Sequence, residues 1–86
     1  MTVEQITQTL LDHLYEINPV AKQRKPLPLD QSLLEIGVMD SFAIIELVNH
    51  IEEKWSIQIF DSELTKEKFG GLTKMATLIK EKLDTK

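Results

Sequence analysis

Residues 37–55 read GVMDSFAIIELVNHIEEKW, and the interpretation of the whole chain starts from this stretch. Gly37 and the Asp40-Ser41 pair supply turn and helix-capping chemistry. The fifteen residues from Ser41 to Trp55 contain neither proline nor glycine. The stretch therefore predicts a helix that begins at the Asp40-Ser41 pair and continues to Trp55.

Apolar residues occupy two sides of this helix. At about 100° per residue, one stripe gathers on a single side and is expected to be buried: Ile44, Leu47, Val48, Ile51 and Trp55. Phe42 and Ile45 lie roughly 100° or more from the centre of that stripe, so we expect both to be partly exposed. Polar residues share or border their side: Glu46, Asn49, Glu52 and Glu53. We call this second side, with Phe42 and Ile45 at its centre, the docking face.

Length and composition limit the chain to a small class of proteins. Its 86 residues are 42% hydrophobic and include no cysteine. We expect one domain over residues 1–86, with a modest core that needs neither disulfides nor structural zinc. No lysine or arginine precedes Lys22, and there is no long apolar run. We therefore expect no signal peptide, no membrane insertion and a cytoplasmic location.

Acidic residues dominate the middle of the chain. The net charge is −4, and no lysine or arginine falls between Pro26 and Glu53. That interval holds six carboxylates: Asp30, Glu35, Asp40, Glu46, Glu52 and Glu53. Such a surface argues against nucleic acid, whose phosphates require positive charge, and fits basic protein partners. The alternative is a solvated acidic face that only keeps the domain soluble.

Two further helices are expected near the ends of the chain. Thr2 and Gln5 have the form of a capping box for a helix that ends at Asn18-Pro19. Its buried stripe is expected to be Val3, Ile6, Leu10, Leu14 and Ile17. After the Gly70-Gly71 break, Thr73 is the expected N-cap of a last helix from Lys74 to about Leu83.

The connections complete a helical architecture. Residues 18–40 form a long loop, in which Asp30 is expected to cap a helical turn over 31–36 that Gly37 closes. Residues 56–60 alternate like a strand but have no partner strand, so we expect an extended link that buries Ile57 and Ile59. A short helix should follow, from Asp61 or Ser62 to about Lys68. The predicted fold is all-α: a small four-helix bundle of three main helices and a short third one, with a long loop between helices 1 and 2.

The residue pattern argues against a catalytic or metal site. Ser41, Glu46 and His50 could be combined into a triad only on paper, because Ser41 and His50 lie roughly 13 Å apart along one helix. His13 and His50 are far apart in sequence and have no ligand-spaced neighbours, so we expect no metal site and interpret His13 as a surface residue. We expect that the chain is not an enzyme.

Ser41 is the exception among the polar residues. A serine at this position is commonly only a helix cap. Asp40 can cap equally well, however, which would leave the Ser41 hydroxyl free at the first helical position. A helix N-terminus favours phosphate through its unpaired amides and its dipole. Ser41 is therefore a candidate for covalent attachment of a group through phosphate, beside the docking face.

The same stretch resembles the acyl and peptidyl carrier proteins. The resemblance rests on Asp40-Ser41-Phe42, followed by Ile45-Glu46-Leu47-Val48 and Ile51-Glu52-Glu53-Lys54-Trp55. It extends to the long first loop, the link containing Ile57 and Ile59, the short third helix and the last helix.

The resemblance implies a four-helix bundle whose serine, here Ser41, receives 4′-phosphopantetheine from coenzyme A. The terminal thiol of this arm would carry an acyl or aminoacyl group as a thioester. The implied partners are a phosphopantetheinyl transferase, a loading ligase, adenylating enzyme or acyltransferase, and a downstream synthase or transferase. These partners would catalyse the reactions, and the carrier would deliver the acyl or aminoacyl group to them.

The resemblance also assigns roles on the helix that follows the serine. Phe42, Ile45 and Asn49 would make apolar or close contacts with partner enzymes. The carboxylates would face arginine and lysine residues of those partners: Asp40, Glu46, Glu52 and Glu53.

Two departures concern the cargo. Fatty-acid carriers usually read Leu-Gly-x-Asp-Ser, whereas this chain has one more residue between Gly37 and Asp40, and Phe42 replaces the usual leucine. The pattern looks more like specialised stand-alone carriers, such as D-alanyl carriers or discrete carriers of polyketide and nonribosomal peptide assembly. The alternative function is a helical protein–protein interaction domain without a prosthetic group, in which Ser41 is only a cap.

Overall fold

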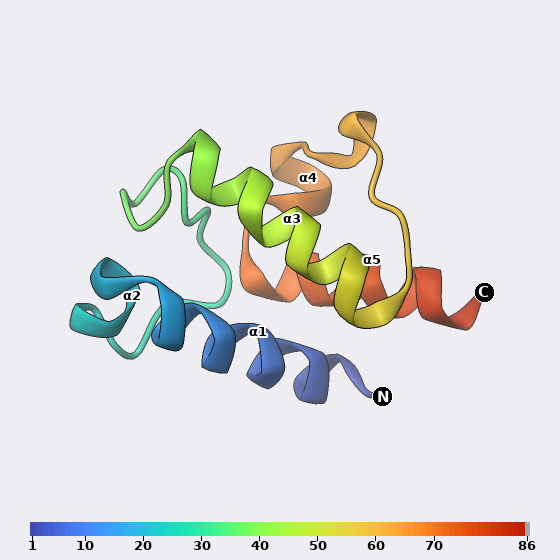
Figure 1. Ribbon diagram of the computed structural model, residues 1–86, viewed down its shortest axis with the longest axis horizontal. Coiled ribbons are helices and arrows are strands. Elements are labelled where there is room, and N and C mark those ends of the chain that lie inside the picture. The colour runs from blue at the N-terminus through green and yellow to red at the C-terminus, as the bar shows by residue number, and fades with distance from the viewer. Residues whose placement is uncertain (86) are drawn as a thin grey trace.

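The computed structural model describes residues 1–85 as an assembly of helices, with no strand among these residues (Figure 1). The elements are α1 (Val3–Ile17), α2 (Pro19–Gln23), α3 (Ser41–Trp55), the 3₁₀ turn η1 (Asp61–Glu63), α4 (Lys66–Phe69) and α5 (Leu72–Asp84). The predicted all-α bundle of three long helices and a short one before the last is confirmed. Helix α2 was not predicted.

The three long helices share one apolar core. Helices α1 and α5 pack most closely and run in opposite directions, and α3 starts at the α2 end of the molecule and runs obliquely to them (Figure 1). The largest fully buried side chains come from all three and from the loop before α3: Ile6, Leu10, Leu14, Leu33, Leu47, Ile51, Leu72, Met75 and Ile79. The core thus fixes the orientation in which α3 presents its other side to solvent.

The predicted stripes are confirmed in α3 and, with one exception, in α1. Ile44 is half-buried, and the other members of the α3 stripe are buried. In α1 the exception is Ile17, whose side chain is 51% exposed. Ile17 is the last residue of α1, where the chain turns into α2.

Asn18 ends one helix and begins the next. Its N–H donates to the Leu14 carbonyl at 2.8 Å, which closes α1 as predicted. Its side-chain Oδ1 accepts from the N–H groups of Val20 at 3.0 Å and Ala21 at 3.1 Å, which caps α2. Pro19 fills the first position of α2, where its missing N–H costs nothing. The predicted break at Asn18-Pro19 is correct, but the same pair is also the signal for a helix start.

The start of α5 differs from the prediction. The helix begins at Leu72 with Gly71 as N-cap, so Thr73 is not the cap. The Thr73 N–H donates instead to the Leu29 carbonyl at 3.0 Å, across from the long loop. A Cβ at Gly71 would lie 3.1 Å from the carbonyl oxygens of Leu29 and Gln31, so a glycine permits this close crossing. A contact between distant segments has replaced the local cap.

The remaining connections follow the prediction in outline. Residues 33–37 form turns rather than a helix, and Ser32, not Asp30, accepts the backbone hydrogen bond that starts them, from Glu35 N–H at 3.4 Å. Gly37 closes the turn with φ +77°, as expected. The segment predicted as one short helix is divided into η1 and α4, because Thr65 caps a new start through its Oγ1, 3.2 Å from the Lys68 N.

A pair of stacked histidines connects α1 to α3. The rings of His13 and His50 are nearly parallel, with an interplanar angle of 2° and centroids 3.4 Å apart. His13 is therefore half-buried against α3 rather than a plain surface residue. Burial lowers the pKa of His13, charge on His50 and Lys54 acts in the same direction, and Glu16 opposes the shift.

The stack makes stability depend on pH. Unfolded His13 binds a proton near pH 6.5, and folded His13 binds it only at lower pH. Between these values the unfolded chain binds more protons, so stability is fully present above pH 6.5 and is lost as the pH falls through the folded pKa. Urea unfolding between about pH 8 and pH 5 should show this loss, and the His13→Gln variant should show a shallower one. Parallel curves for the two proteins would contradict the assignment.

Candidate functional site

Ser41 stands at the N-terminus of α3 with its hydroxyl exposed. The Asp40 carboxylate accepts the Ala43 N–H at 2.8 Å and thereby caps the helix. Ser41 is the first helical residue, and within residues 1–85 its side chain has no hydrogen-bond partner. The expectation that Asp40 caps and leaves the serine free is therefore correct. The first amides of α3 and its dipole suit a phosphate group on this hydroxyl.

The backbone that leads to Ser41 is anchored to the core. Val38 and Met39 are buried, and their N–H groups donate to the Leu33 carbonyl at 2.9 and 3.2 Å. Gly37 supplies the left-handed conformation that brings them there. Ser41 thus stands on an ordered turn.

The docking face contains an exposed apolar pair. Phe42 is 72% exposed and Ile45 is 50% exposed, three residues apart and therefore neighbours on the helix surface. Asn49 is exposed on the next turn of the same side. The predicted exposure of Phe42 and Ile45 is confirmed, and two such side chains together suit an apolar pocket on a partner.

The acidic residues at the border of this face differ in their structural roles. Glu46 and Glu53 are exposed, whereas Glu52 is half-buried. Glu52 Oε2 accepts the Ile59 N–H at 2.8 Å and so holds the link 56–60 against α3. Ile59 is buried there and Ile57 is half-buried, as the sequence predicted. The structure therefore gives Glu52 a role in the fold, and its contact with partners stays a prediction.

An open hollow of about 160 Å³ lies on another side of α3. Its apolar lining comes from the loop before α3, from α3, from the segment between η1 and the end of α4, and from α5: Leu33, Leu34, Ile44, Leu64, Phe69 and Met75. Lys66 of α4 and Glu35 of the loop form an ion pair of 2.8 Å among the lining residues. The hydrogen bond and charge of Glu35 raise the pKa of Lys66. A local sequence pattern cannot reveal this hollow, because residues from four separate segments form it.

The structure leaves Ser41 and His50 far apart on α3. His50 stacks on His13 and is some two and a half turns from Ser41. Within residues 1–85, no group of three or more His, Cys, Asp or Glu side chains could hold a metal ion. None of the helices in these residues combines the length and the hydropathy that crossing a bilayer requires.

Sequence reasoning missed one set of residues near Ser41. Side chains at both ends of α2 contact the turn that precedes α3: Asn18 donates to the Val38 carbonyl and Arg24 to the Ile36 carbonyl. The cap residue Asn18 followed by Pro19 was the available signal for α2. The contacts themselves join residues twelve or more positions apart and leave no trace in a local pattern.

Comparison with known proteins gives a consistent result. Residues 5–79 match the family model described as "Phosphopantetheine attachment site". A D-alanyl carrier protein of Streptococcus pyogenes serotype M5 (strain Manfredo) is 26% identical over 81 residues, covering 94% of this chain and 95% of that protein. A D-alanyl carrier protein of Lactococcus lactis subsp. cremoris (strain MG1363) is 34% identical over 56 residues, covering 65% of this chain and 71% of that protein.

The family match includes the whole of α3, most of α1 and α5, and the turn between α2 and α3. It agrees with an exposed serine on a helix N-terminus, beside an apolar and acidic face. The chain belongs to the phosphopantetheine-attachment family, the carrier proteins that bear a 4′-phosphopantetheine prosthetic group and carry acyl or aminoacyl groups on it as thioesters.

Proposed function

We propose that the chain is a stand-alone carrier, one domain over residues 1–86, whose arm is attached to Ser41. The observation that carries the proposal is the free, exposed hydroxyl of Ser41 at the first position of α3, with Asp40 serving as the cap. Attachment would form a bond between Ser41 Oγ and phosphorus and break the pyrophosphate bond of coenzyme A, releasing adenosine 3′,5′-bisphosphate. The thiol at the end of the arm would hold the cargo as a thioester.

The partners would be enzymes, and the carrier itself would not be one. A phosphopantetheinyl transferase would attach the arm, a ligase or adenylating enzyme would load it, and a transferase would remove the cargo. Phe42 and Ile45 would enter an apolar pocket on these enzymes, while Glu46 and Glu53 would face basic residues at its rim. Asp40 would also face these basic residues, in addition to capping α3. All of these steps are expected in the cytoplasm.

The proposed cargo is a small aminoacyl group, with D-alanyl as the first candidate. The names of both relatives support this choice. The extra residue between Gly37 and Asp40 points in the same direction, towards a specialised carrier.

Ser41→Ala tests the attachment site. Wild-type protein incubated with coenzyme A and a broad-specificity phosphopantetheinyl transferase should gain the mass of one arm, and the variant should gain none. Because Asp40 provides the cap, the variant should lose much less than the roughly 1 kcal/mol of stability that removal of an N-cap costs. Intact-mass measurement and urea unfolding check both points. An arm on folded Ser41→Ala protein would refute the assignment, and an unmodified wild type beside a modified control carrier would favour the interaction domain.

The cargo is tested on the arm-bearing protein. With ATP and a D-alanine-activating ligase, the intact mass should increase by one alanyl group, and hydroxylamine should remove it because it cleaves thioesters. L-Alanine and octanoate, each supplied with its own activating enzyme, are the controls. Equal loading and equal thioester lifetime for octanoate would contradict the small-cargo proposal.

Glu46→Lys tests the docking face. The KM of the transferase for this variant should rise several-fold at low salt, and the difference should shrink as the ionic strength increases, because exposed charges act through screened attraction. Glu81→Lys on α5 makes the same charge change on an exposed residue of another helix and is the matched control. If the two variants behave alike at every salt concentration, net charge rather than the docking face is responsible. Glu52→Lys is unsuitable for this purpose because it would also break the hydrogen bond to Ile59.

A further inference from the structure

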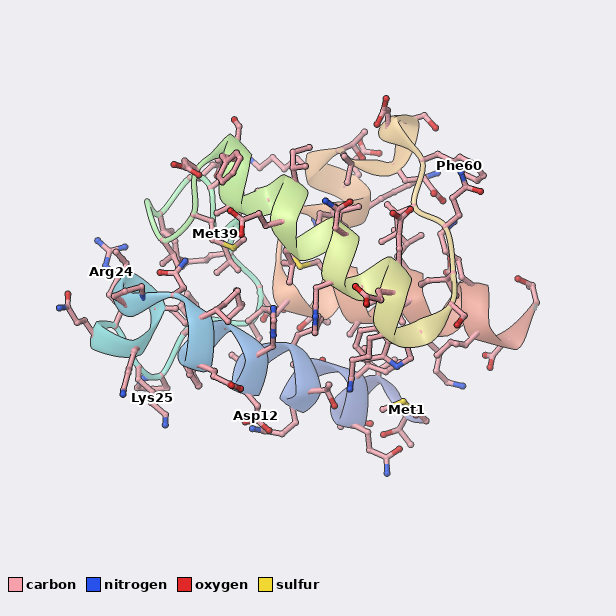
Figure 2. The ribbon with its side chains drawn as sticks, in the orientation of Figure 1. Met1, Asp12, Arg24, Lys25, Met39 and Phe60 are labelled. Carbon is pink, nitrogen blue, oxygen red and sulfur yellow. The ribbon has the colours of Figure 1, made fainter. Side chains whose placement is uncertain are left out.

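The turn that leads to Ser41 is held from outside by α2. We call residues 36–40 the attachment turn. Two of its backbone carbonyls accept hydrogen bonds from side chains at opposite ends of α2. Asn18 Nδ2 donates to the Val38 carbonyl at 3.2 Å, and an Arg24 guanidinium N–H donates to the Ile36 carbonyl. Figure 2 shows Arg24 and Met39 at the same end of the molecule, the end that carries α2 and the start of α3.

Asn18 is oriented for this contact by its own capping role. Its Oδ1 accepts the amides of Val20 and Ala21, so the remaining Nδ2 group is directed to Val38. Arg24 is the C-cap residue of the same helix. The two contacts therefore arise from the two ends of one short, rigid element. Ala21, in the middle of α2, is fully buried and fixes that element on the core.

The contacts lie on either side of the most flexible position in the turn. Gly37 has φ +77° and, without a Cβ, can adopt many other backbone conformations at little cost. Ile36 precedes it and Val38 follows it, and both carbonyls are held by α2. Together with the Leu33 carbonyl, which accepts the Val38 and Met39 amides, this pair of hydrogen bonds limits the freedom that Gly37 would otherwise give to Asp40 and Ser41.

We infer that α2 is a positioning clamp for the attachment site, and that Asn18 and Arg24 act through the turn to keep Asp40 and Ser41 in the conformation that partner enzymes recognise. This inference rests on the proposed attachment at Ser41. If only a fraction of the carrier has the recognised conformation, its apparent affinity for a partner falls by that fraction. Loss of the clamp should therefore raise the KM for the carrier and leave kcat at saturation unchanged.

Two pairs of variants separate the clamp from charge. Asn18→Asp keeps the oxygen that caps α2 but removes the donor to Val38, and Gln23→Glu adds the same charge to the same helix. Arg24→Met removes the donor to Ile36, and Lys22→Met removes an equal charge two residues away. Gln23 and Lys22 are both exposed. Urea unfolding and helical circular dichroism establish that each variant is folded.

The expected result is a rise in KM for arm transfer of roughly three- to tenfold in Asn18→Asp and in Arg24→Met, with kcat unchanged. The two control variants should match the wild type. In the protein without its arm, hydrogen exchange at the Val38 and Ala43 amides should also become faster in the clamp variants. Both amides donate within or next to the attachment turn, Val38 to Leu33 and Ala43 to Asp40.

Three outcomes would overturn the clamp. The first is an unchanged KM in folded clamp variants, even where their stability falls, because a purely structural role would produce that result. The second is an equal rise in KM in the control variants, which would assign the effect to charge. The third is unchanged exchange at Val38 and Ala43. The exchange measurement needs no transferase, so it tests the clamp independently of arm transfer. If the wild-type protein accepts no arm, that result refutes Ser41 as the attachment site, and the exchange rates still decide whether the clamp exists.

Discussion

The hydrogen bond from the Ala43 N–H to the Asp40 carboxylate sets the position of everything that follows in α3. A helix must satisfy its first amides with some acceptor, and Asp40 does so from the last residue of the turn. Ser41 is consequently the first helical residue and has no capping duty. The cap fixes where α3 begins, and the apolar stripe that packs in the core decides which of its residues face solvent.

One side of α3 packs in the core, and the other side is available for recognition by partners. The buried side is closed by large residues such as Leu47 and Ile51, whose side chains are fully inaccessible. The exposed side carries Phe42 and Ile45, which a protein that only needed solubility would not display together. Glu52 belongs to both uses of the helix, because it is near the docking face and holds the link after α3 through Ile59. A change at this position would therefore alter stability and surface charge at once.

Much of this arrangement could be predicted from the sequence, because it depends on local pattern. The two sides of α3, the capping box of Thr2 and the break at Asn18 all follow from spacing and side-chain chemistry. The predictions that were wrong concern places where distant segments of the chain are in contact. The Leu29 carbonyl replaced the expected Thr73 cap, and His13 found an aromatic partner on another helix. At the candidate site, Ser41 and the docking face were predictable, whereas the contacts of α2 with the attachment turn were not.

The crossing of the long loop over Gly71 has a consequence for how the chain tolerates damage. Leu29 lies in the middle of the longest connection, yet its carbonyl accepts the Thr73 N–H at the start of the last helix. Proteolytic cleavage between α2 and the attachment turn would therefore not simply open a surface loop. It would also free the N-terminus of α5, which packs closely on α1. Cleavage of this loop would therefore weaken the packing of the bundle as well as open a surface segment.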